Sequence, residues 1–187
     1  ANFVARLLAE ASPGDEVVAF FSRTRANPLV DSSRVCAVPL DVRSADDVLG
    51  KTRGLDALAH FAGSVNYARR SRREVWDVNV LGARNVFEAV LANRIGRLLY
   101  VSSINVLGAC RDGGGPPADE SNDVYDPRAG NPNSFRSAAE ALAAVQASVA
   151  GDYRFLRGVR VAYFDSKLAA FELAGQYHRG RGLPVVT

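Results

Sequence analysis

Five short apolar runs, separated by longer stretches with helical periodicity, set the pattern of this chain. They are residues 16–21, 34–40, 56–61, 97–101 and 183–187. The runs are continuous in apolar character rather than alternating, which is typical of strands covered on both faces. Strands that alternate with helices at this rhythm predict a parallel sheet with helices on both sides. We therefore expect an α/β fold with a doubly wound parallel sheet.

The segments between the strands carry apolar residues at helical spacing. They predict an opening helix at residues 3–11 that ends near Ser12, and a short helix at 44–49 capped by Ser44. A long helix at 72–93, interrupted near Gly82, and two later helices at 134–149 and 163–178 follow. Glycine, proline, aspartate and asparagine gather in residues 108–133. That composition predicts a surface loop.

The composition is that of an ordinary globular protein, with 187 residues, 48% of them hydrophobic and 23% charged. No apolar run approaches the roughly 20 residues that a membrane span needs. Cys36 and Cys110 are too few for a disulfide framework and lack the spacing of metal ligands, so we expect reduced, partly buried thiols and no metal. A soluble cytoplasmic protein without a membrane partner is the prediction.

The net charge of +3 comes from arginine, since only two of the 23 basic residues are lysines. The densest cluster is Arg69-Arg70-Ser71-Arg72-Arg73, and Glu74 and Asp77 follow it at once. A basic cluster without a recognition motif is weak evidence for nucleic-acid binding. We expect no nucleic-acid partner.

The sharpest chemical pattern is Tyr163-Phe-Asp-Ser-Lys167. On a helix, residues four apart lie on one face, so the phenol of Tyr163 and the ammonium of Lys167 can approach one site. A neighbouring cation favours the phenolate, and a phenol so tuned can exchange a proton with a substrate oxygen. The alternative is an interface aromatic beside a solvated charge.

A second element is the pair Ser102-Ser103, which stands just past the strand predicted for residues 97–101. Open α/β sheets bind their ligands beyond the carboxyl ends of their strands. Serines at such a position can also satisfy backbone groups, which is the structural alternative. Together with Tyr163 and Lys167, the pair predicts an active site.

In these motifs the chain resembles the extended short-chain dehydrogenase/reductases, which include NAD(P)-dependent epimerases, dehydratases and dihydroflavonol-type reductases. The matching segments run in family order along almost the whole chain: residues 1–8 like the helix after a glycine-rich turn, the strand at 16–21, Pro39-Leu-Asp41-Val42, His60-Phe-Ala62-Gly63, residues 77–85, Ser102-Ser103, Tyr163 with Lys167, and residues 182–186. The resemblance implies a Rossmann-type fold that binds a dinucleotide.

The resemblance also implies roles for single residues. Tyr163 would be the general acid/base, and Lys167 would assist it and bind the nicotinamide ribose. Ser103 would hold the substrate oxygen, and Asn79 would support the proton relay or the helix geometry. The cofactor would be lined by Asp41, Val42, Ala62, Gly63 and Ser102, together with Tyr163 and Lys167. His60 would be a packing residue at a strand end.

The choice of cofactor follows from charge. An NAD site of this type ends its second strand with a carboxylate for the ribose hydroxyls, whereas a 2′-phosphate calls for arginine. Here Phe21 stands near that position and Ser22, Arg23 and Arg25 follow. We therefore expect NADP in preference to NAD, with solvated arginines as the alternative.

Two differences from the family bear on the domain organisation. The glycine-rich turn and the first strand have no counterpart here, and the stretch from Ser103 to Tyr163 is about twice as long as in the family. We expect residues 1–187 to form a partial Rossmann domain with an insertion around residues 109–160. The C-terminal substrate-binding portion would lie outside this chain.

The function expected from the resemblance is an NAD(P)-dependent reductase or dehydrogenase that acts on a small molecule. A nucleotide-sugar epimerase would use the same residues. A sugar dehydratase is less expected, because such enzymes have Thr-Asp-Glu where this chain has Ser103-Ile104-Asn105. A non-catalytic dinucleotide-binding sensor or assembly protein is the alternative from another class, and a homodimer stays open.

Overall fold

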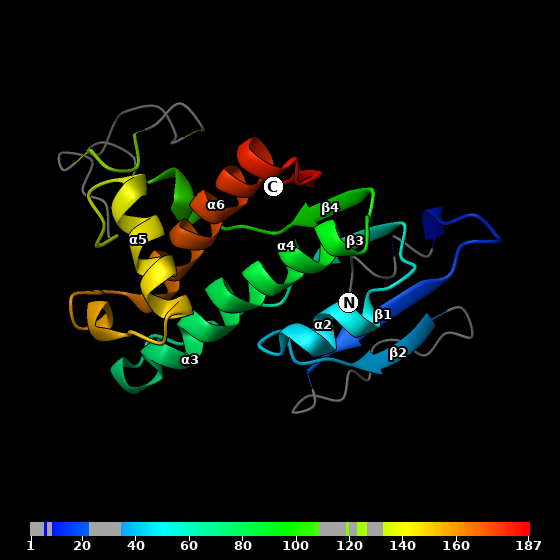
Figure 1. Ribbon diagram of the computed structural model, residues 1–187, viewed down its shortest axis with the longest axis horizontal. Helices are drawn as coiled ribbons and strands as arrows, with labels where there is room; N and C mark the ends of the chain where they lie inside the picture. The colour runs from blue at the N-terminus through cyan, green and yellow to red at the C-terminus, as the bar shows by residue number, and fades with distance from the viewer. Residues whose placement is uncertain (1–5, 7–8, 23–34, 109–118, 120–122, 127–132) are drawn as a thin grey trace. The chain divides into compact units, whose positions relative to one another are not determined.

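The computed structural model describes the chain except residues 1–5, 7–8, 23–34, 109–118, 120–122 and 127–132 (Figure 1). The chain forms two compact units, Ala1–Asp41 and Val42–Thr187. Most of the predicted opening helix lies outside the described residues, although Arg6, Ala9 and Glu10 are helical. Each unit is described by itself below.

The first unit contains two parallel strands, β1 (Val17–Phe21) and β2 (Val35–Pro39). The backbone N–H of Leu40 donates to the carbonyl of Phe21 at 2.8 Å and extends the pairing. β1 is half-buried, but three of the five β2 residues are exposed, so the prediction that β2 is covered on both faces is wrong. Cys36 is a free, exposed thiol rather than a partly buried one. Cys110 lies outside the described residues.

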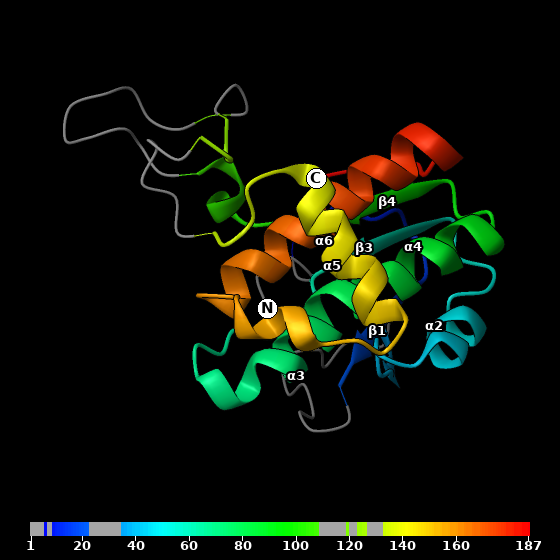
Figure 2. The same ribbon diagram turned by 60° about the vertical axis from the view of Figure 1, so that its left-hand side comes forward.

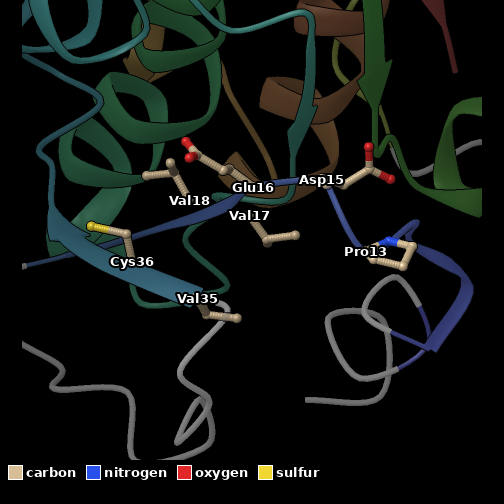
Figure 3. Close-up of a pocket in the computed structure, with 8 residues that line it drawn as sticks. Pro13, Asp15, Glu16, Val17, Val18, Val35 and Cys36 are labelled. Atoms are coloured by element: carbon tan, nitrogen blue, oxygen red, sulfur yellow. The ribbon is translucent and has the colours of Figure 1, made fainter.

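An open pocket lies at the start of the two strands of the first unit (Figure 3). Residues 13–18, Val35 and Cys36 line it. These positions are at the amino ends of β1 and β2, whereas open parallel sheets bind cofactors beyond the carboxyl ends. The pocket therefore lies at the opposite ends of β1 and β2 from Ser22 and Asp41, the cofactor residues predicted in this unit.

The second unit is built on three parallel strands in the order β3-β4-β5: β3 (Ala57–His60), β4 (Arg97–Tyr100) and β5 (Val185–Val186). One face of this sheet packs on helices α4 (Gly82–Ala92) and α6 (Ala162–Arg181) (Figure 1). The ring of Phe87 on α4 lies 5.5 Å from that of Tyr100 and 5.8 Å from that of Tyr177 on α6. These contacts form the core of the unit.

The predicted short helix is α2 (Ala45–Lys51). Its N-cap is Ser44, whose hydroxyl accepts from the backbone N–H of Asp47 at 3.2 Å, as the sequence predicts. Asn93, at the end of α4, donates to the carbonyl of Leu49 and to the hydroxyl of Thr52. These two bonds hold α2 against α4.

The predicted long helix is interrupted where expected. After the 3₁₀ turn Arg69–Ser71 and α3 (Arg72–Trp76), the π-helical segment η2 (Asp77–Leu81) ends where α4 begins, at Gly82. A Cβ at Gly82 would lie only 2.8 Å from Cγ2 of Val42, so glycine permits the close approach of the two segments. Single π turns occur frequently at functional sites.

The stretch between Ser103 and Tyr163 contains η3 (Ile104–Leu107), α5 (Ala138–Val149) and the 3₁₀ turn η5 (Arg154–Arg157). α5 packs alongside α6 in both views (Figures 1 and 2). Its N-cap is Ser137, so the helix begins four residues later than the sequence suggested. The aromatic rings of Phe135 and Phe155 pack against the fully buried Trp76.

One buried carboxylate joins the two ends of segment 134–160. Asp165, on α6, accepts from the backbone N–H of Ser134 at 2.6 Å and from its hydroxyl at 2.7 Å. The same hydroxyl accepts from the backbone N–H of Arg160 at 2.7 Å. Burial raises the pKa of Asp165. These bonds hold the two ends of segment 134–160 together beside Asp165, two residues after Tyr163 in the chain.

Among the residues that the structure describes, no helix is long and apolar enough to cross a membrane.

Candidate active site

Ala62, Gly63 and the serine pair lie at the carboxyl ends of β3 and β4, and Tyr163 and Lys167 lie on the first two turns of α6. Loop 61–68 follows β3 and residues 101–108 follow β4. The backbone N–H of Val101 donates to the carbonyl of His60 at 3.1 Å, so the two strand ends are held together. This is the edge at which open parallel sheets bind their ligands.

Lys167 reaches from α6 to the end of β4. Its side chain is buried, with 6% of the residue exposed, and Nζ donates to the carbonyl of Val101 at 2.9 Å. Nζ also lies 5.3 Å from the centre of the Tyr100 ring, within the range of a cation–π contact. Burial lowers the pKa of Lys167. Since an ammonium has three protons to donate, this arrangement orients the group and leaves donors for a ligand.

Tyr163 lies one turn before Lys167 on the same helix, as the spacing predicts. It is half-buried and its ring is 6.0 Å from that of Tyr67, edge to face. Phe164 lies beside both rings, 6.2 Å from Tyr67 and 5.9 Å from Tyr163. The phenol therefore stands in an aromatic cluster that joins α6 to the loop after β3.

The two serines after β4 differ in their surroundings. Ser103 is the N-cap of η3, and its hydroxyl oxygen accepts from the backbone N–H and side-chain amide of Asn105 at 3.3 and 3.0 Å. Ser103 thus satisfies a backbone group, the structural alternative stated from the sequence. Because its oxygen only accepts in these bonds, its hydroxyl proton can still donate. Ser102 Oγ is buried and has no partner among the described residues.

Ser102 is one of three unpaired buried polar groups near the ends of β3 and β4. The others, within the described part of the chain, are the hydroxyl of Tyr100 and Nε2 of His60. A buried polar group without a partner costs about 1–3 kcal/mol. Together with the free donors of Lys167, the unpaired Ser102 fits a ligand that brings hydroxyl or amide groups, as a nicotinamide riboside does.

His60 is a packing residue, as predicted. It is 5% exposed, and its ring stacks on that of Tyr100 at 5.7 Å. Burial and the cationic charge of Lys167 lower the pKa of His60 to about 4, so it is neutral near pH 7. A neutral, buried imidazole beside Lys167 adds no positive charge to the site.

Asn79 joins the loop after β3 to α6. It is 2% exposed and stands in the π turn η2. Its Oδ1 accepts from the backbone N–H of Ser64 at 2.7 Å, while Nδ2 donates to the Ser64 carbonyl at 3.1 Å and to Ser166 Oγ at 2.9 Å. Ser166 Oγ donates in turn to the carbonyl of Tyr163 at 2.9 Å. These bonds join loop 61–68 to α6 through Asn79.

The predicted cofactor residues are divided between the units. In the second unit, the carbonyl of Val42 accepts from Asn85 Nδ2 at 2.9 Å, and Ala62 and Gly63 are exposed on loop 61–68. In the first unit, Ser22 is exposed directly after β1 and Asp41 is half-buried shortly after β2. Arg23 and Arg25 lie outside the described residues.

Sequence reasoning missed Tyr67, Tyr100, Ser64 and Ser166. Ser64 directly follows Gly63 and Ser166 directly precedes Lys167, so their position beside predicted site residues was a signal. Tyr67 and Tyr100 adjoin no predicted site residue, and Tyr67 meets Tyr163 only through a contact between segments distant in the chain.

A family model matches most of the chain. The model of the NAD dependent epimerase/dehydratase family matches residues 1–161. The chain belongs to this family. The match ends two residues before Tyr163, so the roles given to Tyr163 and Lys167 depend on their geometry in α6.

Two curated proteins are similar to parts of this chain. Human 3 beta-hydroxysteroid dehydrogenase type 7 is 38% identical over 76 residues, which are 40% of this chain and 21% of that protein. Sterol demethylase protein B of Methylococcus capsulatus is 30% identical over 108 residues, 58% of this chain and 32% of that protein. The matched stretches thus span a third or less of these relatives.

Solved structures confirm the Rossmann-type α/β fold. A dTDP-glucose 4,6-dehydratase from Streptomyces venezuelae, with NAD and TYD bound, has a TM-score of 0.66 and 25% identity over 98% of this chain and 49% of its own. UDP-glucose 4-epimerase from Thermus thermophilus, in complex with NAD, has a TM-score of 0.61 and 20% identity over 97% of this chain and 48% of its own. The chain spans about half the length of these structures.

Proposed function

We propose that this chain is part of an NAD(P)-dependent oxidoreductase that interconverts a carbonyl and a hydroxyl on a small molecule. The observation that carries the proposal is the placement of Lys167 one turn after Tyr163, with its amine held at 2.9 Å by the carbonyl of Val101, directly before Ser102 and Ser103. The match to an NAD-dependent family and the similarity to a dehydrogenase support an oxidoreductase.

Each side chain would then have one task. The Tyr163 hydroxyl would exchange a proton with the substrate oxygen, and the Ser103 hydroxyl would donate a hydrogen bond to that oxygen. The donors of Lys167 that Val101 does not use would bind the ribose. Asn79 would hold loop 61–68 against α6. When bound, the nicotinamide supplies or accepts the hydride.

We propose NADP as the cofactor in preference to NAD. The basis is the sequence Ser22-Arg23-Thr24-Arg25, which follows β1 where an NAD site has a carboxylate. Titration of the enzyme should give a dissociation constant at least about tenfold lower for NADPH than for NADH, because guanidinium groups pair with the 2′-phosphate. Replacing Arg23 and Arg25 with serine should remove this difference. Equal or tighter binding of NADH by the unchanged enzyme would contradict the proposal.

A nucleotide-sugar epimerase is the second candidate, favoured by the family description and by the similarity to UDP-glucose 4-epimerase. The two functions differ in their electron balance. A dehydrogenase should release one NAD(P)H for each alcohol oxidised. With the oxidised cofactor in excess, this appears as an increase in the absorbance of the reduced cofactor. An epimerase returns the hydride to its substrate, so product would form without net reduction. A sensor or assembly protein would bind cofactor and turn over neither class of substrate.

We expect the partner to be a small molecule. The exposed free thiol of Cys36 is compatible with a reducing compartment such as the cytoplasm. Three expectations from the sequence stay predictions: that the protein forms a homodimer, that residues around 109–160 are an insertion relative to the family, and that the protein has an additional substrate-binding portion.

A further inference from the structure

Loop 61–68 and the residues after β4 expose large apolar side chains beside the proposed reacting groups. Val65 is 64% exposed, Tyr67 63% and Ile104 80%. Tyr67 touches the Tyr163 ring edge to face, and Ile104 directly follows Ser103. Isolated exposed apolar residues are normal, but Tyr67 and Ile104 adjoin residues of the candidate active site.

The same two segments carry no charge. Residues 61–68 and 101–108 contain no aspartate, glutamate, lysine or arginine. Two of their polar side chains already have hydrogen-bond partners. The side chain of Asn66 accepts from the backbone N–H of Ala68, and the side chain of Asn105 donates to the hydroxyl of Ser103. A hydrocarbon gains free energy from burying apolar surface on such uncharged segments.

The position of loop 61–68 is fixed rather than incidental. Asn79 holds both backbone groups of Ser64, and Tyr67 packs on Tyr163 and Phe164. A substrate whose oxygen meets Tyr163 and Ser103 would therefore lie with its adjoining carbon skeleton against Tyr67 and Ile104. Exposed aromatic area of this kind is typical of sites for apolar ligands.

We infer that the substrate is an apolar ring alcohol or the corresponding ketone, and that Tyr67 is a specificity-determining residue that contacts its hydrocarbon portion. This inference rests on the proposed function. In the oxidative direction the carbinol C–H bond breaks as its hydride leaves to the oxidised nicotinamide, and the O–H proton passes to Tyr163. The products are the ketone and the reduced cofactor, so atoms and electrons balance.

The test compares kcat/KM for isopropanol, cyclohexanol, decalol and UDP-glucose with the oxidised cofactor in excess. We expect kcat/KM to rise at least about tenfold from cyclohexanol to decalol, because the second ring adds apolar contact. In Tyr67→Ala that gain should fall about tenfold, while Tyr67→Phe should keep it. Val149→Ala, which shortens an apolar side chain 44% exposed at the end of α5, is the control and should change nothing.

The outcomes separate the inference from the function beneath it. No gain from the second ring, a preference for UDP-glucose, or an unchanged gain in Tyr67→Ala would overturn the apolar-substrate inference and leave the oxidoreductase in place. Absence of Tyr163-dependent turnover with every substrate would overturn both. Because Tyr67 is exposed, its variants should fold, which circular dichroism checks.

Discussion

Tyr163→Phe should lower kcat by about 10²–10⁴-fold while leaving the dissociation constant of the cofactor within about twofold. The phenol would be the group that exchanges a proton with the substrate oxygen, and phenylalanine keeps the ring while removing the proton. No hydrogen bond joins this hydroxyl to another described residue, so its loss removes no described structural bond. The ring contacts with Tyr67 and Phe164 would remain. Single-turnover kinetics and cofactor fluorescence measure the two effects.

The chain offers a matched control for this variant. Tyr125 is also half-buried, and its hydroxyl donates to Glu172 of α6 at 2.7 Å. Tyr125→Phe should cost about 1 kcal/mol of unfolding free energy and leave kcat unchanged. If Tyr163→Phe kept normal turnover, the proposed acid/base role would be wrong. If both variants lost turnover equally, the effect would belong to the packing of α6.

Features that depend on neighbours in the chain could be predicted. Ser44 caps α2 because its hydroxyl needs only a backbone group three residues on. The interruption at Gly82 and the positions of Tyr163 and Lys167 on one helix follow from local spacing in the same way. The strands were found from their apolar runs, each within two residues at either end.

Features that depend on distant partners could not be predicted. Ser134 was expected to open a helix, but it bonds Asp165, 31 positions away, so α5 begins at Ala138. The buried residues of α5 are Ala141, Ala144, Val145 and Ser148. Small residues allow close packing of α5 on other helices, and Val149 is 44% exposed.

The candidate site shows the same division. Tyr163, Lys167 and the serine pair were chosen because each belongs to a short motif, and their role as reacting groups stays a prediction. The groups that position them were found only in part. Asn79 was chosen by resemblance, while its partners Ser64 and Ser166 emerge from contacts across 15 and 87 positions. Short motifs indicate which groups could react, whereas hydrogen bonds between distant segments hold those groups in position.

Asn79→Ala should reduce both stability and turnover. It removes three hydrogen bonds and leaves the backbone groups of Ser64 without their partners, since alanine can neither donate nor accept through its side chain. We expect a loss of about 2–4 kcal/mol in unfolding free energy, because each unpaired buried group costs about 1–3 kcal/mol. Thermal unfolding followed by circular dichroism measures it.

The effect on turnover separates a positioning residue from a purely structural one. Asn93→Ala is the matched control, because it also removes two bonds between segments, to Leu49 and Thr52, at the end of α4 far along the helix from η2. Measured at a temperature where both variants are folded, kcat should fall at least about tenfold in Asn79→Ala and stay normal in Asn93→Ala, since small displacements of reacting groups are costly.

A milder variant keeps this prediction testable if Asn79→Ala fails to fold. Ser166→Ala removes the bond from Asn79 and the bond to the Tyr163 carbonyl, but leaves Asn79 on Ser64. It should lower kcat in the same direction by a smaller factor, with the loss in unfolding free energy near 1 kcal/mol. Normal kcat in both Asn79→Ala and Ser166→Ala would mean that Asn79 stabilises the fold without positioning the site. A fall in kcat in both, with Asn93→Ala unaffected, would assign to Asn79 the alignment of the loop after β3 with the helix that carries Tyr163 and Lys167.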